Sequence, residues 1–363
     1  MLLVLIAVAA VPTYLFTRKM ANLNRARNNH IAIYWYRQGQ RQLNAGRPEE
    51  ALVSLREATA NDHDNRAFAF TLAQALSATN RNDEARLALV RLRESAPENP
   101  QINLQLARLS ARNHDLPEAI RYYHHALYGL WTGERVDEQR RQVRLELIRL
   151  LLDQKDRSRA LAELLVLSSD APRTADTQLE LGQLFLEAGN ASNALQHFAG
   201  ANPLDGRNVA ALSGAGEAAY QLGDYRTAER YLARAVEFDS TARRAAQTLE
   251  AARLVQSSDP LAAHLPRTER VRRLTAALRQ SMRRLQKCPD SGDGAVRNSL
   301  QMQAETLLPR ITPENLREDP ELLAAGAELV LKIEETTNQT CGPAAGMDQA
   351  LLLAGRKHRA SER

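Results

Sequence analysis

The residues of this chain that most readily suggest chemistry are its two cysteines. Cys288 and Cys341 each follow a predicted helix and precede a turn that contains Pro and Gly. Two thiols at matching helix ends can oxidise to a disulfide, which persists in oxidising compartments; two free thiols are the alternative. A metal site is disfavoured because there is no CxxC motif and the nearest histidines, His264 and His358, lie far away in sequence.

Two adjacent histidines, His124 and His125, are the other candidates for chemistry. Neighbouring residues on a helix point to different sides, so these imidazoles cannot chelate one ion together. The sequence contains no GxSxG, HExxH or Walker motif, and no GxGxxG after a strand. We therefore expect no catalytic residues, no metal and no cofactor. An enzyme with its site in residues 261–363 is the alternative from a different class.

The composition favours an all-α protein. Hydrophobic residues make up 44% and charged residues 25% of the 363 residues, as in ordinary folded proteins. Leu, Ala, Arg, Glu and Gln predominate, and these are strong helix formers. The net charge of +5 is mild and dispersed, so we expect no nucleic-acid binding. Anionic lipid explains a basic balance equally well.

The first residues are strongly apolar. Residues 1–16 carry no charge, and Arg18 and Lys19 follow directly. Because a bilayer-spanning helix needs about 17–25 residues, we predict an uncleaved transmembrane anchor at 1–17 and a juxtamembrane linker at 18–31; a cleaved signal peptide is the alternative. The positive charges favour a cytoplasmic body, whereas the paired cysteines favour an oxidising compartment. We expect the extracytoplasmic, periplasmic side, with the cytoplasmic side as the alternative.

Small and bulky residues recur with a period. An alanine returns at steps of 34 residues, with one step of 41, at Ala51, Ala85, Ala119, Ala160, Ala194 and Ala228. Twelve residues earlier lie mostly small residues: Gly39, Ala73, Ala107, Ile148, Gly182 and Gly216. A bulky residue follows each alanine: Leu55, Leu89, Tyr123, Leu164, Phe198 and Leu232. Helices approach closely only where side chains are short, so each period predicts a helix pair. Its turn falls at Gly46, Asn80, His114, Lys155, Gly189 or Gly223.

This pattern resembles the tetratricopeptide repeat (TPR) family, whose 34-residue signature is W-x2-L-G-x2-Y, A-x3-F and P. The first unit has Trp35, Gly39 and Ala51, and the sixth has Gly216 and Tyr220. The resemblance implies a right-handed superhelix of about six helix pairs with a concave groove. The repeats are predicted at 32–65, 66–99, 100–133, 141–174, 175–208 and 209–242, with an insertion at 134–140. In the adjoining loop, Trp131 either covers the end of the third unit or anchors a partner.

Two further segments follow the repeats. Residues 243–257 are predicted to form a capping helix, and residues 261–363 a helical bundle with a basic tail. Within the bundle, 267–287 is an amphipathic helix with Val271, Leu274, Leu278 and Leu285 on one face. Its eight basic residues, against one Glu, form either a solvated face or a docking surface for anionic partners or lipid headgroups.

The resemblance also implies which residues line the groove. They are Tyr36, Gln40, Asn44, Phe70, Gln74, Leu104, Arg108, Arg112, Leu145, Arg149, Leu179, Gln183, Glu217 and Tyr220. Long polar side chains beside apolar ones suit an extended peptide or helix of another protein. Because Arg108, Arg112 and Arg149 cluster centrally, we expect that segment to be acidic.

The predicted function is that of a non-catalytic, membrane-tethered scaffold. It would assemble or regulate an envelope-associated complex by binding a partner protein in the groove. A cytoplasmic-facing assembly or quality-control factor and a component of polysaccharide export are the alternatives within the same class.

Overall fold

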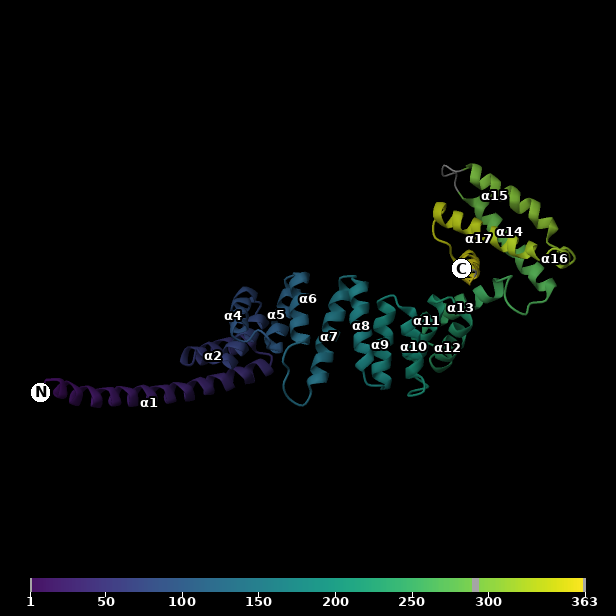
Figure 1. The fold of residues 1–363 in the computed structure, drawn as a ribbon. Helices are drawn as coiled ribbons and strands as arrows, with labels where there is room; N and C mark the ends of the chain where they lie inside the picture. Colours follow the sequence, from purple (N-terminus) through teal and green to yellow (C-terminus); the bar gives the residue numbers. More distant parts are fainter. Residues whose placement is uncertain (1, 289–293, 362–363) are drawn as a thin grey trace. The chain divides into compact units, whose positions relative to one another are not determined.

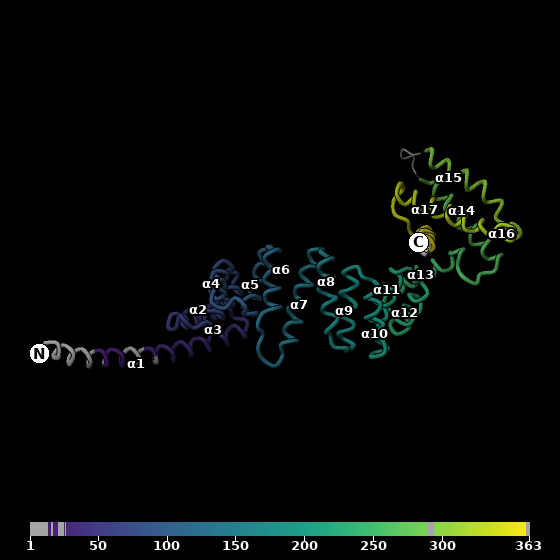
Figure 2. Tube along the Cα trace, in the orientation of Figure 1, coloured from purple at the N-terminus to yellow at the C-terminus, as the bar shows by residue number. Residues whose placement is uncertain are grey.

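The computed structural model describes residues 2–288 and 294–361, and every regular element within these ranges is a helix (Figures 1 and 2). Within these ranges, the described side chains exclude those of residues 2–13, 16, 21–24, 26 and 361. The chain divides into two compact units, Met1–Glu163 and Leu164–Arg363. The expected all-α class is confirmed, whereas the handedness of the superhelix remains a prediction.

The first unit consists of helices joined by short turns. They are α1 (Leu2–Asn44), α2 (Pro48–Asn61), α3 (Arg66–Ala78), α4 (Asn82–Ser95), α5 (Pro100–Arg112), α6 (Leu116–Leu127), α7 (Val136–Asp153) and the first half of α8 (Arg157–Asp170). Within this unit α1 packs on α2, α3 on α4, and α5 on α6, as the predicted helix pairs require.

Helix α1 runs without a break through the predicted anchor, the predicted linker and the first helix of repeat 1. Residues 18–38 contain no Gly or Pro, so nothing in the sequence ends the helix there. Among the residues whose side chains are described, no helix is long and apolar enough to span a bilayer. Most of the anchor predicted at 1–17 lies outside those residues, and the structure gives that prediction no support.

The six predicted turn residues all have left-handed backbones. Their φ angles are 70° at Gly46, 58° at Asn80, 60° at His114, 59° at Lys155, 82° at Gly189 and 75° at Gly223. In the first turn the N–H of Arg47 donates to the carbonyl of Gln42 at 2.9 Å, which is the bonding of a Schellman motif. The turn positions predicted from the period are therefore confirmed.

The columns of small and bulky residues meet inside the repeats. All six alanines of the column that begins at Ala51 are 0% exposed. A Cβ placed on Gly182 would lie 2.7 Å from the ring of Phe198, and one on Gly216 would lie 2.4 Å from Leu232. The bulky residue of the second helix thus fills the space left by the small residue of the first, as predicted.

The predicted insertion at 134–140 is mostly helical. Helix α6 ends at Leu127 and α7 begins at Val136, so the connecting loop covers 128–135. Asp137 and Glu138 lie in the first turn of α7, where carboxylates are favourable near the positive end of the helix dipole. The extra residues therefore lengthen α7 rather than forming a loop.

The second unit contains the rest of α8, the last repeats and the C-terminal bundle. Its further helices are α9 (Ala175–Glu187), α10 (Ala191–Ala201), α11 (Val209–Gln221), α12 (Tyr225–Phe238), α13 (Arg243–Ser258), α14 (Arg267–Lys287), α15 (Gly294–Leu307), the 3-10 turn η1 (Leu308–Arg310), α16 (Asn315–Glu318), α17 (Glu321–Thr340) and α18 (Gly346–Ser361). Helix α14 coincides with the amphipathic helix predicted at 267–287.

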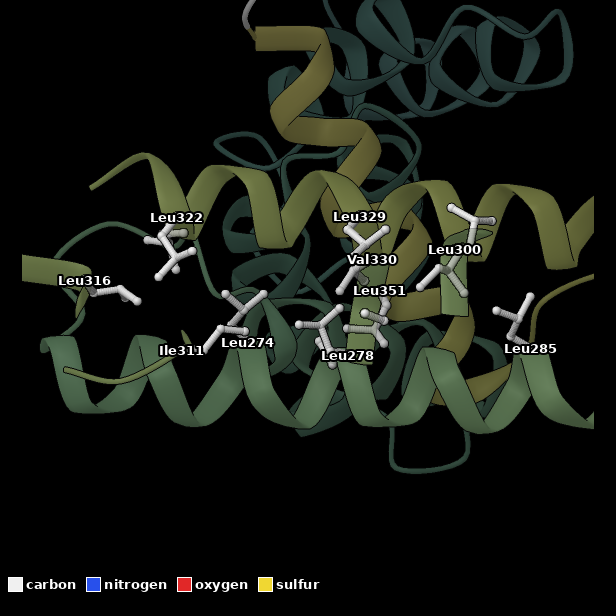
Figure 3. Packing of buried hydrophobic residues seen from close by; sticks show 14 residues of the cluster. Leu274, Leu278, Leu285, Leu300, Ile311, Leu316, Leu322, Leu329, Val330 and Leu351 are labelled. Carbon is white, nitrogen blue, oxygen red and sulfur yellow. The ribbon is translucent and has the colours of Figure 1, made fainter. Parts of the chain in front are cut away.

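A hydrophobic core joins α14 to α17. Leu274 and Leu278 point from α14 towards Leu329 and Val330 of α17 (Figure 3). Leu274 and Leu278 are 0% exposed. The predicted apolar face of α14 is therefore its buried face.

The predicted basic tail is a packed helix instead. On α18, the His358 imidazole lies 2.9 Å from the Asp259 carboxylate, and Arg359 lies 2.9 Å from Glu335. Ala350 and Ala354 of α18 share a core with α13. Helix α13 therefore packs between α12 and α18. The ion pair between His358 and Asp259, which are distant in sequence, holds α18 in this position.

Candidate protein-binding groove

A groove of about 500 Å³ lies along α3, α5, the loop 128–135 and α7. Its apolar lining consists of Phe70 on α3, Leu104 on α5, Trp131 in the loop and Val143 on α7. These side chains come from three repeats and converge because helices of successive repeats stack side by side. We call this surface the repeat 2–4 groove.

Five side-chain amides accompany the apolar residues of the groove: Gln74, Gln101, Gln105, Gln139 and Gln142. Among the described residues, none of these amides has a hydrogen-bond partner. Each amide can both donate and accept a hydrogen bond. They can therefore pair with the N–H and C=O groups of an extended backbone.

The central charges of the groove are already paired. Arg108 donates from Nε and Nη2 to the two oxygens of Glu146, at 2.8 and 2.6 Å. The hydrogen bond to Glu146 raises the pKa of Arg108. Beneath the pair, burial and then the Glu146 carboxylate raise the pKa of Tyr123 to about 12. Arg112, which lies outside the groove lining, donates to the carbonyl oxygen of Ser77 at 3.1 Å and to its hydroxyl.

This pairing changes the expected partner. The charge of Arg108 is balanced by Glu146, and the rim adds one cation, Arg135, and one anion, Glu138. An acidic partner segment, which the sequence suggested, is therefore not required by the groove.

The predicted groove residues of the first unit divide into two sets. Phe70, Gln74, Leu104 and Arg108 line the groove together. Leu145 does not, because it is 5% exposed and belongs to the core, which corrects its predicted position.

At the first repeat, Tyr36 packs on Phe68 with ring centroids 4.6 Å apart. The Tyr36 hydroxyl also accepts a hydrogen bond from Gln40 at 2.8 Å. Asn44, Arg112 and Arg149 are exposed and lie outside the lining of the repeat 2–4 groove.

In the second unit, Gln183 and Glu217 line a separate cavity of about 400 Å³ formed by helices α9 to α13. Glu217 lies 3.5 Å from Arg244 and accepts a hydrogen bond from Thr248 at 3.4 Å. Tyr220 packs against Tyr225, with ring centroids 5.4 Å apart. Leu179 is half-buried and lines neither cavity.

Sequence reasoning offered Trp131 as a partner anchor, but it placed neither Trp131 nor Gln139 and Val143 of α7 in the groove lining. The Trp131 indole donates to the carbonyl of Ala126 at 2.8 Å, and the Leu130 N–H donates to the carbonyl of Glu98 at 3.0 Å. These bonds hold the loop against α6 and the turn before α5, and they keep Trp131 at the groove. Gln139 and Val143 come from the lengthened α7. The sequence did contain a signal for this part of the lining. A Trp and several Gln lie near the place where the spacing between the repeat alanines widens from 34 to 41 residues.

The two adjacent histidines have separate surroundings. The His124 Nε2 lies 3.2 Å from the Glu163 carboxylate. Burial, followed by nearby arginines, lowers the pKa of His125. Over residues 2–288 and 294–361, no three His, Cys, Asp or Glu side chains are grouped so that they could hold a metal ion.

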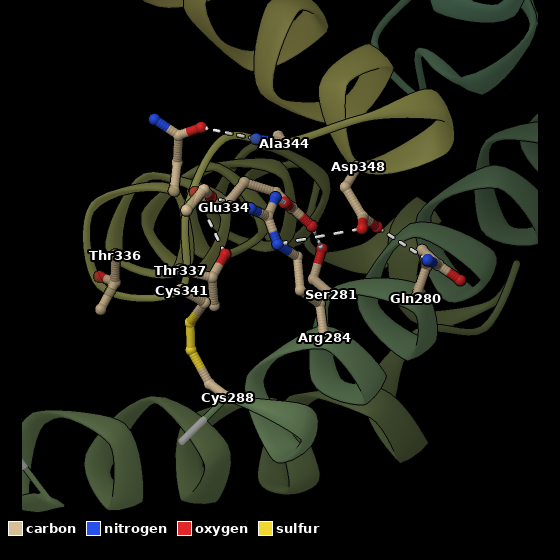
Figure 4. Close-up of polar contacts among 12 residues, drawn as sticks. Gln280, Ser281, Arg284, Cys288, Glu334, Thr336, Thr337, Cys341, Ala344 and Asp348 are labelled. Atoms are coloured by element: carbon tan, nitrogen blue, oxygen red, sulfur yellow. Dashed lines mark hydrogen bonds and ion pairs between the residues drawn. A yellow bond between two sulfur atoms is a disulfide. The ribbon is translucent and has the colours of Figure 1, made fainter. Parts of the chain in front are cut away.

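A disulfide joins Cys288 to Cys341 in the C-terminal bundle, with Cα atoms 5.5 Å apart (Figure 4). This separation lies within the usual range for such bonds. It ties the end of α14 to the end of α17.

A buried ion pair lies next to the disulfide. Arg284 donates to Glu334 at 2.8 Å and to the carbonyl of Gly342 at 2.9 Å, while Ser281 donates to Glu334 at 2.7 Å (Figure 4). Burial and then Asp348 act to raise the pKa of Glu334, and they outweigh the opposing effects of Ser281 and Arg284.

Comparison with known proteins identifies the repeats. Two family models described as tetratricopeptide repeat match residues 42–109 and 145–206. Anaphase-promoting complex subunit 3 of Schizosaccharomyces pombe is 30% identical over 129 residues, which is 36% of this chain and 18% of that protein. The chain thus spans less than a fifth of the length of this curated relative.

Solved structures of TPR proteins are also similar. YrrB, described as a TPR protein with an unusual peptide-binding site, has 16% identity and a TM-score of 0.42, covering 53% of this chain and 96% of its own. The C-terminal part of a TPR repeat-containing protein from Cytophaga hutchinsonii has 11% identity and a TM-score of 0.46, covering 84% and 98%. The family models show that this chain contains tetratricopeptide repeats, which are typical of protein–protein interaction scaffolds.

Proposed function

We propose that the chain is a non-catalytic scaffold whose repeat 2–4 groove holds an extended segment of a partner protein. The observation that carries this proposal is the combination of four apolar side chains with five amides that have no partner among the described residues. Apolar side chains of the segment would pack against Phe70, Leu104 and Trp131. The glutamine amides would pair with its backbone.

The size of the groove limits the affinity. One buried apolar side chain contributes about 1.5–3 kcal/mol, and one net hydrogen bond about 0.5–1.5 kcal/mol. If the bound segment buries two such side chains and forms four hydrogen bonds, their favourable free energy is offset by an association cost of about 4–15 kcal/mol. We therefore expect micromolar or weaker binding by this groove alone. Because Arg108 is paired with Glu146, binding should depend only weakly on salt.

A displayed library of extended peptides, selected on the full chain, tests this proposal. Replacing both Gln105→Ala and Gln142→Ala should weaken the selected peptides about tenfold, since two hydrogen bonds are lost. Gln196→Ala, at an exposed amide on α10, is the matched control. Peptides that bind the double variant as tightly as the unchanged chain would contradict the groove assignment.

We further propose that residues 1–17 tether this scaffold to a membrane, with the body on the extracytoplasmic, periplasmic side and an envelope-associated complex as its target. The uncharged run at 1–16 supports the tether. The Cys288–Cys341 pairing supports an oxidising compartment. Resistance to alkaline extraction tests the tether. Thiols that alkylate in intact cells without reductant would instead favour the cytoplasmic alternative, an assembly or quality-control factor.

A further inference from the structure

The outward face of α14 is a charged surface that the proposed scaffold function does not use. Leu274, Leu278 and Leu285 turn the opposite face into the bundle core (Figure 3). Apart from Arg267, which begins the helix, the exposed residues share one side: Thr268, Arg272, Ala276, Arg279, Arg283, Gln286 and Lys287.

Three basic residues of α14 are paired with carboxylates, two of them with largely buried guanidinium groups and one, Arg272, on the surface. Arg284 is paired with the buried Glu334. Arg273 and Arg272 share Glu269, at 2.7 and 2.6 Å. Of these pairs, only the Arg284–Glu334 pair joins α14 to α17, and all three charges are already balanced by a carboxylate.

Five others have no acidic partner among the described residues: Arg267 and Arg270 at the start of the helix, and Arg279, Arg283 and Lys287 further along it. Arg279, Arg283 and Lys287 are exposed, and within the described residues none of them forms an ion pair. Arg283 donates only to the neutral amide of Gln280, at 2.6 Å. Spacings of four residues place the three side chains in one row, about 12 Å long, on the helix. We call this row the basic stripe.

The helix that carries the basic stripe is held firmly. The Cys288–Cys341 disulfide fixes its C-terminal end, and Ser281 and Arg284 bind Glu334 one turn earlier. The three cations therefore have a fixed spacing instead of moving with a free tail.

We propose that the basic stripe is a docking surface for the headgroups of an anionic membrane, an inference that rests on the proposed membrane tether. A protein partner would require an apolar centre, since interface energy concentrates in a buried core. The stripe offers none, because its exposed neighbours are Ala276 and Gln286. Its three cations line neither the cavity of about 400 Å³ nor that of about 620 Å³ between α15 and α17. A row of cations without a groove fits a planar layer of negative headgroups.

The test uses the full chain, reconstituted into vesicles of phosphatidylcholine alone or mixed with phosphatidylglycerol. An environment-sensitive fluorescent amino acid at Ala276 reports contact of α14 with the lipid. We expect a blue shift with anionic vesicles, no shift with neutral ones, and suppression of the shift by high salt.

The triple variant Arg279→Glu, Arg283→Glu and Lys287→Glu should lower the contact equilibrium by roughly 100-fold or more. The control reverses three exposed arginines of the first unit, Arg37→Glu, Arg66→Glu and Arg91→Glu, and should keep the shift. Circular dichroism checks that both variants are folded.

Vesicle flotation of the same samples reports the tether separately. A chain that floats with both vesicle types, but whose fluorophore is silent on anionic ones, would overturn the stripe proposal and leave the tether intact. Equal fluorescence blue shifts on anionic vesicles for the triple variant and the control would also overturn the stripe proposal. Failure to float on neutral vesicles contradicts the tether alone, and a blue shift on anionic vesicles would still support the stripe.

Discussion

At the residue scale, the clearest energetic feature is the Glu334 carboxylate, which is 0% exposed. Burial raises its pKa above the ordinary value of 4.5. Arg284 opposes this by favouring the charged form. A folded-state pKa above the unfolded one means that protonated Glu334 stabilises the fold at low pH. That contribution is lost as the pH rises through the folded-state pKa.

Arg284→Met should therefore destabilise the bundle in a pH-dependent manner. Removing one partner of a buried pair costs about 3–5 kcal/mol when the other remains charged. We expect that loss at pH 8 and a smaller one at pH 5, where Glu334 more readily takes up a proton. Urea unfolding at the two pH values measures it, with Arg283→Met on the exposed face as the control. If Arg284→Met lowers the free energy of unfolding equally at both pH values, the charge of Glu334 is not the cause of the loss.

The groove shows why single residues are hard to assign from sequence. Arg108 looked available for an acidic partner, yet it is paired with Glu146, 38 positions away. A repeat pattern places Arg108 on the concave side but says nothing about a carboxylate on the next repeat. The four lining residues that were predicted followed from the TPR resemblance and the repeat register, whereas Trp131 required the conformation of a non-repeating loop.

At the element scale, the helix pairs depend on the small residues between them. Ala194 is 0% exposed on α10, against α9. Ala194→Leu adds volume to a filled contact and should lower the free energy of unfolding by about 1–3 kcal/mol. Ser192→Leu, at an exposed position of the same helix, should leave it nearly unchanged. Thermal or urea unfolding that shows equal stability for the two variants would mean that the register is wrong.

Turns and columns could be predicted because they depend on local properties. A left-handed turn favours Gly or Asn, and a close helix contact favours Ala or Gly, so most positions of both columns recur with the period. His114, Lys155 and Ile148 were placed by the period and not by residue type. The beginning of α7 and the packing of α18 could not. No capping residue marks the beginning of α7, since the N-cap residue Arg135 makes no side-chain cap hydrogen bond. The packing of α18 depends on the pair of His358 with Asp259, 99 positions apart.

At the scale of the whole molecule, we expect the disulfide to stabilise the C-terminal bundle. It joins residues with a sequence separation of 53. Closing a loop of this size in the unfolded chain stabilises the fold by about 4 kcal/mol in the chain-entropy estimate. Reductant should therefore shift the unfolding transition of the bundle to lower denaturant. The double variant Cys288→Ser, Cys341→Ser should show the shifted transition with or without reductant. If reductant still shifts the unfolding transition of the double variant, the disulfide is not the cause of the shift.

The central claim is that the repeat 2–4 groove holds an extended segment of another protein, and site-specific crosslinking in intact cells tests it most directly. A photoreactive amino acid replaces Gln101 or Gln142 in the groove, or Val53, which is 64% exposed on α2, as the control. We predict that both groove positions crosslink to one short segment of the same protein, and that Val53 does not. Groove positions that give no product beyond that of Val53, or products scattered over unrelated proteins, would contradict the account.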